Sequence, residues 1–323
     1  MIINRHSEDD EKAREERKKR REERRARRRQ NEQTPEQEDK TIRIDPSDVK
    51  VTEFHAGQIT NIPERNGLLV QKALEQGRRH FGRPGASLTQ LDDPKWQGKL
   101  PEGWKRDVLD KALEGEETTS AMIQDWMKDK PGVVLIDSVH IRGAGKEEID
   151  PDTGLIEAGD TDHIVVMGGH VLIIDSKRWR GGKDDTKIIN YIQADDGSVQ
   201  RFGKAFPGGN VHIAAAIRMW FDYLQNVDIE KTLLGMIHIV SDNVKVLRYR
   251  NWYNVRNKQY WLLVEKSRFI EELDAWYTGF KVNDEERRTI SSDIVAQIAV
   301  CCCKPYDRMA ELINMKPLEG YAV

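Results

Sequence analysis

The sequence predicts an α/β fold in which helices cover a mixed central sheet. Apolar residues recur at helical spacing after Trp104, and short apolar runs bounded by Gly and Pro follow. From 104 to 240 these elements come in the order α-β-β-β-α-β. At their centre, Gly168-Gly169 joins two β-rich runs, which is a strong signal for a tight hairpin. Both faces of this hairpin are apolar in the middle, as is typical of a sheet covered on both sides.

The elements of this core are expected in the following order. A helix begins near Trp104 and ends before Pro131-Gly132. A buried strand at 133–136 follows, then a loop at 142–160 that is rich in Gly, Pro and Asp, and then the two hairpin strands, 164–167 and 171–174. Later residues predict helices at 211–224, 269–277 and 285–303, and strands at 233–240, 244–247 and 260–264.

Four segments are expected along the chain. They are a charged arm that is disordered or helical, an N-terminal extension, the core and a helical C-terminal segment, at 1–40, 41–103, 104–281 and 282–323. The extension is expected to be loop apart from a short helix around 68–79. In the arm, residues 17–29 hold ten Lys/Arg against two Glu and no apolar seam for a coiled coil. This arm is either a solubilising tail or an arm that grasps nucleic acid.

Composition excludes several classes of protein. The 323 residues carry a net charge of −3, so the chain as a whole is not a basic nucleic-acid binder, and such binding must come from local patches. There is no apolar run of about 18 residues and no apolar segment near the first residues, so neither a membrane partner nor secretion is expected. The three cysteines are adjacent, Cys301 to Cys303, which favours neither disulfides nor zinc. The cytoplasm is the expected compartment.

The hairpin gathers polar side chains at its open end. If Gly168-Gly169 is a two-residue turn, Asp162 falls opposite Asp175, and Lys177 returns to the same face. Two opposed aspartates have Cβ atoms about 5 Å apart. Their like charges repel each other, and a divalent cation such as Mg²⁺ would compensate them. Two other interpretations stay open, a strand end splayed into water and a one-residue slip of the register. His163 and His170 would lie on the opposite face, in packing or surface roles.

The residues from Gly115 to Gly181 resemble the nuclease-related domain (NERD) family, of the PD-(D/E)xK, restriction-endonuclease-like superfamily. The resemblance rests on Gly115-Glu116, on Asp162-His163 opening an apolar strand, and on Asp175-Ser176-Lys177-Arg178-Trp179-Arg180-Gly181. It is strong from 162 to 181 and looser over the rest of 104–280. The fold it implies is the restriction-endonuclease-like core, whose order of elements matches the one above.

The resemblance also implies roles for individual residues. Asp162, Asp175 and Glu116 would hold Mg²⁺ or Mn²⁺, and Lys177 would be the catalytic lysine. Glu117 is the alternative helix acid, although Glu116 shares the apolar helix face. Asp175 stands where the family commonly has Glu. The stretch before the helix that carries His212 lacks the family's Gln, so His212 stays outside the expected catalytic set.

The expected function is therefore metal-dependent hydrolysis of nucleic-acid phosphodiesters, with DNA preferred over RNA as the expected substrate. Arg178, Arg180 and Lys183 follow the motif and are either phosphate contacts or solvated cations. The alternative is a non-catalytic nucleic-acid-binding or assembly module on the same fold, with the termini engaging a protein partner or a second copy. Residues 143–146 and 150–154 resemble a phosphate loop and a calcium loop only in part, and both are interpreted as turns.

Overall fold

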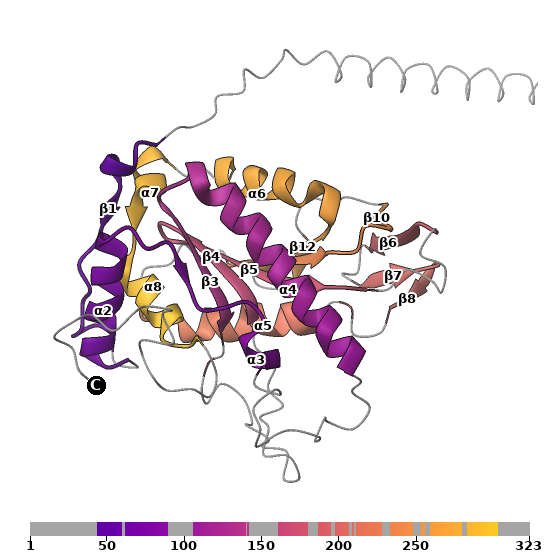
Figure 1. The fold of residues 1–323 in the computed structure, drawn as a ribbon, viewed down its shortest axis with the longest axis horizontal. Coiled ribbons are helices and arrows are strands. Elements are labelled where there is room, and N and C mark those ends of the chain that lie inside the picture. Colours follow the sequence, from indigo (N-terminus) through magenta and orange to yellow (C-terminus); the bar gives the residue numbers. More distant parts are fainter. Residues whose placement is uncertain are drawn as a thin grey trace, which may run out of the picture. The chain divides into compact units, whose positions relative to one another are not determined.

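The computed structural model describes residues 44–59, 62–89, 106–139, 141, 161–179, 187–194, 198–206, 209, 211–227, 233–247, 253–255, 259–279 and 283–302. The chain divides into two units, Met1–Arg43 and Ile44–Val323. The first unit, with the predicted charged arm, lies outside the described residues, as do the two partial loop motifs at 143–146 and 150–154. The second unit is a mixed α/β structure (Figure 1). No helix in these ranges combines the length and the apolar character needed to cross a membrane.

A mixed sheet of seven strands forms the centre of this unit. Its spatial order is β11-β12-β9-β5-β4-β3-β2. In that order the strands are Tyr253–Val255, Gln259–Glu265, Leu234–Ile239, His170–Lys177, Thr161–Met167, Val133–Val139 and His80–Phe81. β3, β4 and β5 are antiparallel neighbours, whereas β9 runs parallel to both β5 and β12. The predicted mixed sheet and the strands that build its middle are confirmed.

The hairpin of β4 and β5 has the predicted register. Met167 pairs with His170, and the ladder continues to His163 and Ile174. Gly168 has a φ of 54°, a left-handed conformation that glycine adopts without a steric penalty, so the tight turn forms there. The slipped register is thereby excluded.

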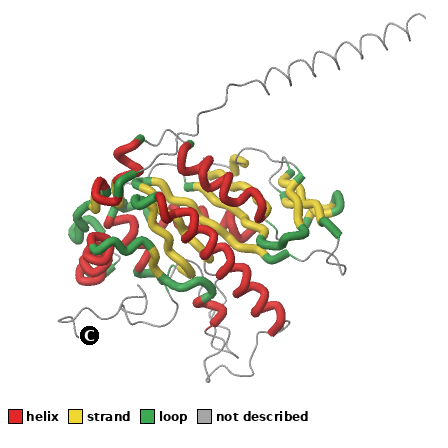
Figure 2. Tube along the Cα trace, turned by 45° about the horizontal axis from the view of Figure 1, so that its top comes forward, coloured by secondary structure: helices red, strands yellow, loops and turns green. Residues whose placement is uncertain are grey.

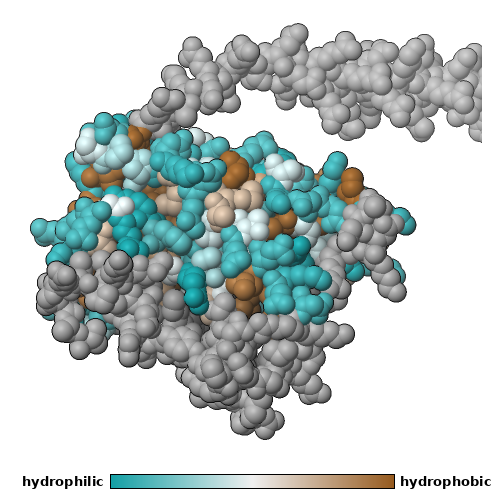
Figure 3. Space-filling view, viewed as in Figure 1, coloured by the Kyte–Doolittle hydropathy of each residue, from teal (hydrophilic) through white to brown (hydrophobic). Residues whose placement is uncertain are grey.

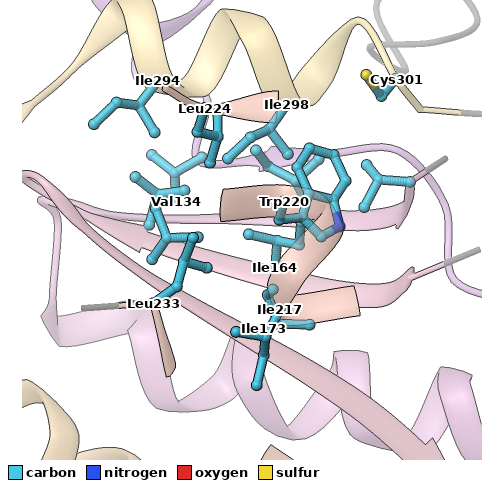
Figure 4. Packing of buried hydrophobic residues seen from close by; sticks show 14 of the residues in the cluster. Val134, Ile164, Ile173, Ile217, Trp220, Leu224, Leu233, Ile294, Ile298 and Cys301 are labelled. Atoms are coloured by element: carbon cyan, nitrogen blue, oxygen red, sulfur yellow. The ribbon is translucent and has the colours of Figure 1, made fainter. Parts of the chain in front are cut away.

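Helices cover both faces of the sheet, as Figures 1 and 2 show. α4 (Arg106–Trp126) and α6 (Phe269–Thr278) lie over one face. α5 (Val211–Tyr223), α8 (Ser292–Ala299) and α2 (Glu64–Glu75) pack their apolar residues into the core on the other face. In Figure 4, Ile164 and Ile173 of the hairpin contact Ile217 and Trp220 of α5. The apolar residues that alternate along β4 and β5 therefore divide between the two helix layers.

A second, four-stranded sheet was not predicted, and it combines three strands that lie between β5 and α5 in the sequence with one, β10, that follows β9. Its order is β10-β6-β7-β8, formed by Val244–Val246, Ile189–Gln193, Val199–Arg201 and Lys204–Ala205. Only β10 had been expected as a strand. The others have two to five residues each, too few for an alternating pattern to stand out. The predicted order α-β-β-β-α-β thus holds for the large elements, with β6, β7 and β8 inserted before the second helix.

The two ends of this unit are more ordered than the sequence predicted. The extension contributes η1 (Pro46–Asp48), β1 (Lys50–Val51), α2, β2 and α3 (Ala86–Thr89), where a short helix and loop had been expected. The helix predicted over 285–303 is interrupted. α7 (Asp284–Arg288) is capped by Asn283, β13 (Thr289–Ile290) pairs with β1, and Ser291 caps a new helix, α8. Two further short turns, η4 (Met127–Asp129) and η5 (Lys266–Arg268), adjoin α4 and α6.

Candidate active site

The open end of the β4–β5 hairpin brings the two predicted aspartates together. Continuing the observed register places Asp162 across from Asp175, and the backbone N–H of Ser176 donates to Asp162 Oδ2 at 2.6 Å. Asp162 is 8% exposed and the side chain of Asp175 is 14% exposed. Both carboxylates are thus held at the edge of the core, where they cost free energy unless a positive charge compensates them.

Lys177 supplies that positive charge in the described structure. Its Nζ donates to Asp175 Oδ1 at 2.5 Å. Burial alone would lower the pKa of the Lys177 ammonium, but the charges of Asp175, Asp162 and Glu116 outweigh burial and raise this pKa above its ordinary value. Lys177 therefore stays protonated at neutral pH, and it acts as a cation rather than as a proton acceptor.

Glu116 reaches the same cluster from helix α4. Its side chain is buried, with the residue 5% exposed, and its Oε2 accepts a hydrogen bond from the N–H of Gly85 at 2.9 Å. Glu117 is exposed to solvent instead. Of the two helix acids, Glu116 is thus the one that faces the hairpin, and its charge raises the pKa of Lys177.

The four charged groups have the chemistry that a hard divalent cation requires. Mg²⁺ is commonly held by one or two protein carboxylates, with waters and a substrate phosphate completing its shell. Asp162 and Asp175 would supply such oxygens, with Glu116 beside them. Among the described residues no group of three or more His, Cys, Asp or Glu side chains is already arranged around a point where an ion would sit. Lys177 contacts Oδ1 of Asp175, so an ion held by this carboxylate would either share that oxygen with Lys177 or take the other one.

The predicted phosphate contacts are only partly within the described residues. Arg178 lies just past Lys177, half-exposed, and forms an ion pair with Glu114 of α4. Arg180 and Lys183 lie outside the described part of the chain. His212 is exposed on α5, apart from the buried set. Cys301 and Cys302 are buried and form no disulfide, and Cys303 is not described.

A buried polar network behind the hairpin was not predicted. His163 Nδ1 lies 2.7 Å from Asp137 Oδ1 and His163 Nε2 lies 2.9 Å from Ser176 Oγ. The Ser176 hydroxyl donates to Thr119 of α4, which in turn contacts His238. The chain of contacts ties β3, β4, β5 and α4 together directly behind Asp162 and Asp175.

Asp137 is the charged centre of this network. Burial raises the pKa of its carboxyl, but hydrogen bonds from His163 and His80, with the charges of these rings, lower the pKa to about 2. The hydroxyl of Ser120 also donates to it at 2.6 Å. The sequence held one signal of this role, because Asp137 is a charged residue that directly follows the buried apolar run 133–136.

Comparison with known proteins gives no relative for this chain. No model of a known protein family matches it, and neither a curated protein sequence nor a solved structure does. Its function must therefore be argued from its own residues.

Proposed function

We propose that this protein is a metal-dependent nuclease that hydrolyses nucleic-acid phosphodiester bonds, built on a restriction-endonuclease-like core. One observation carries the proposal, namely that Asp162, Asp175, Lys177 and Glu116 converge at the open end of a buried hairpin. The order of the large elements and the resemblance of residues 115–181 to the NERD family support the same function.

Each residue has a definite part in this proposal. Asp162 and Asp175, with Glu116 beside them, would hold Mg²⁺ or Mn²⁺. When bound, such an ion polarises a phosphate and lowers the pKa of an attacking water. Lys177 would present its ammonium group to the phosphate oxygens or to the water, where it would stabilise the negative charge that develops during hydrolysis. We expect DNA rather than RNA as the substrate and the cytoplasm as the compartment.

A cleavage assay tests the proposal. The parent, Asp175→Asn and Lys177→Ala proteins are incubated with linear and circular DNA, single strands and RNA, in Mg²⁺, Mn²⁺ or EDTA. Cleavage by the parent should require metal, and either substitution should lower it by about 10²-fold or more. Asp125, near the end of α4, and Lys128 of η4 form an exposed ion pair at 2.7 Å, so Asp125→Asn and Lys128→Ala are matched controls that should cleave like the parent.

The second candidate is a non-catalytic nucleic-acid-binding module. It is favoured by one observation, the hydrogen bond between Lys177 and Asp175, which already satisfies the charge that a metal would otherwise compensate. A folded parent that binds nucleic acid but cleaves none of these substrates in any metal would overturn the nuclease proposal and leave this module in its place.

A further inference from the structure

The small sheet ends in a hairpin turn that carries an unusual residue. β7 and β8 are joined by the two residues Phe202 and Gly203, with Arg201 paired to Lys204 across the turn. Both turn residues have positive φ, 53° for Phe202 and 71° for Gly203, as in a type I′ turn. Gly203 adopts this conformation freely, but a bulky side chain such as Phe202 is a steric outlier there. Asn is the residue that best fits the first position of this turn.

The Phe202 side chain gains nothing from burial that would offset this strain. The residue is 71% exposed, the highest exposure among the large hydrophobic residues of the described chain. An exposed aromatic ring held on a strained turn is the kind of outlier from which a function is inferred. The part of the surface seen in Figure 3 is mainly hydrophilic, with small scattered hydrophobic patches.

The described strands of this sheet carry cations and no acids, and two of the cations, Arg201 and Lys204, flank the turn. Residues 187–194, 198–206 and 243–247 contain no Asp or Glu, and they contain the cations Lys187, Arg201, Lys204 and Lys245. Phe202 and Lys204 are exposed, and Arg201 is partly exposed. Aromatic rings interleaved with cations are typical of surfaces that bind the bases and phosphates of a single strand.

A continuous set of ring contacts leads from this turn to the candidate active site. The Arg201 guanidinium lies 5.5 Å from the Phe202 ring centre and 5.1 Å from that of Phe206. Phe206 packs on Trp179 with 4.8 Å between ring centres. Trp179 follows Lys177 by two residues, so the hairpin is packed against the segment that leaves the site.

We propose that the β7–β8 turn binds single-stranded nucleic acid, with an unpaired base stacked on Phe202 and the neighbouring phosphates held by Arg201 and Lys204. The proposal rests on the proposed function and names its substrate class, namely single strands or unpaired ends. The Arg201 guanidinium lies over the Phe202 ring, which leaves the ring to stack one base. Insertion between two stacked base pairs of a duplex would need both faces of the ring, so the geometry favours an unpaired base.

Binding is measured in EDTA, so that no substrate is cleaved, by the fluorescence anisotropy of labelled oligomers of about 20 nucleotides, longer than the site of a single binding fold. The probes are oligo-dT, a duplex of equal length and an abasic strand that keeps the phosphates without the bases. We expect the parent to bind oligo-dT more tightly than the duplex or the abasic strand. Phe202→Asn should weaken oligo-dT binding about tenfold and leave binding of the abasic strand unchanged.

Further variants separate stacking from folding and from charge. Phe202→Trp should retain the affinity of the parent, and Phe202→Asn should not lower the unfolding temperature, because Asn suits the turn. Phe221→Asn on α5 is the matched control, since Phe221 is 37% exposed and should not affect binding. Lys204→Gln should reduce the slope of log affinity against log salt by about 0.7.

Three results would overturn the proposal. In the first, Phe202→Asn binds oligo-dT as tightly as the parent does. In the second, Phe202→Asn lowers the affinity for the abasic strand as much as the affinity for oligo-dT. In the third, the parent prefers the duplex and this preference depends on Phe202. The result of the cleavage assay, which tests the nuclease proposal, does not depend on these binding results. A chain that stacks bases on Phe202 but never cleaves refutes the nuclease and keeps the binding turn, whereas a chain that cleaves without needing Phe202 does the reverse.

Discussion

His238 shows how burial sets the charge of a single residue in this protein. Its ring lies fully buried in β9 and stacks on Phe269, with 3.8 Å between ring centres and 8° between planes. Burial, together with the nearby charges of His163 and Lys266, lowers the pKa of His238 from 6.5 to about 3. The ring is therefore neutral in the folded protein under conditions where the unfolded chain would protonate it.

This pKa predicts a loss of stability in mild acid. Below pH 6.5 the unfolded state binds a proton at His238 that the folded state does not bind until about pH 3. As the pH is lowered from 6.5 towards 3, this proton uptake should therefore reduce the free energy of unfolding by about 1.4 kcal/mol for each pH unit. Urea unfolding of the parent and of His238→Gln at several values of pH between these limits measures the difference. The variant should show a shallower decline, whereas exposed His212→Gln should follow the parent, and parallel curves for all three would refute the assignment.

His163 compensates the most deeply buried charge of the core, the Asp137 carboxylate. His163→Leu should lower the free energy of unfolding by about 3–5 kcal/mol, because it removes a partner of an ion that has no access to water. The double variant Asp137→Leu/His163→Leu should recover part of this loss, since no buried charge remains. Denaturant unfolding of the parent, both single variants and the double variant gives the coupling free energy between Asp137 and His163. Additive effects would show that the two side chains do not depend on each other.

At the scale of elements, the large features were predictable because their patterns are long or unambiguous. The Gly168-Gly169 turn set the register of β4 and β5, and Asp162, Asp175 and Lys177 followed from alternation along those strands. Glu116 could be preferred to Glu117 only through the apolar face of its helix. The network of Asp137 and His163 could not be predicted, because it joins residues from five strands and a helix whose contacts depend on the tertiary fold.

Close packing between elements at Gly132 gives a prediction at the same scale. This glycine precedes β3, and a Cβ there would overlap the backbone carbonyl of Arg287 in α7. A backbone atom cannot move aside cheaply, so Gly132→Ala should lower the free energy of unfolding by about 1–3 kcal/mol. Gly57→Ala is the control, since nothing lies within 4 Å of its added Cβ. Equal midpoints of chemical unfolding for the two variants would contradict the packing described.

At the scale of the whole molecule, the charge is distributed unevenly. The net charge is −3, but residues 17–29 alone carry a net +8. These residues belong to the unit Met1–Arg43, separate from the unit that holds the core. We expect deletion of residues 1–43 to leave the unfolding temperature unchanged, because none of the described core residues is removed.

The same deletion tests the two interpretations of the arm. An arm that grasps nucleic acid displaces counterions, so its removal should lower both the affinity for DNA and the slope of log affinity against log salt. The slope should fall by about 0.7–0.9 for each phosphate that the arm neutralises in the full chain. Binding isotherms of both proteins between about 50 mM and 200 mM salt measure the change. An unchanged affinity and slope would leave the solubilising tail as the role of this segment.

The pairing of β1 with β13 has a consequence for how the protein is made. The N–H of Ser292 donates to Thr52 Oγ1 across 240 residues of sequence, and α2 packs against α8 beside this hydrogen bond. During synthesis the first elements of the core must therefore wait for the last, with the apolar face of α2 uncovered until the chain beyond β13 has left the ribosome. A polypeptide released early would expose that face, and cellular proteases and chaperones would recognise it as incomplete.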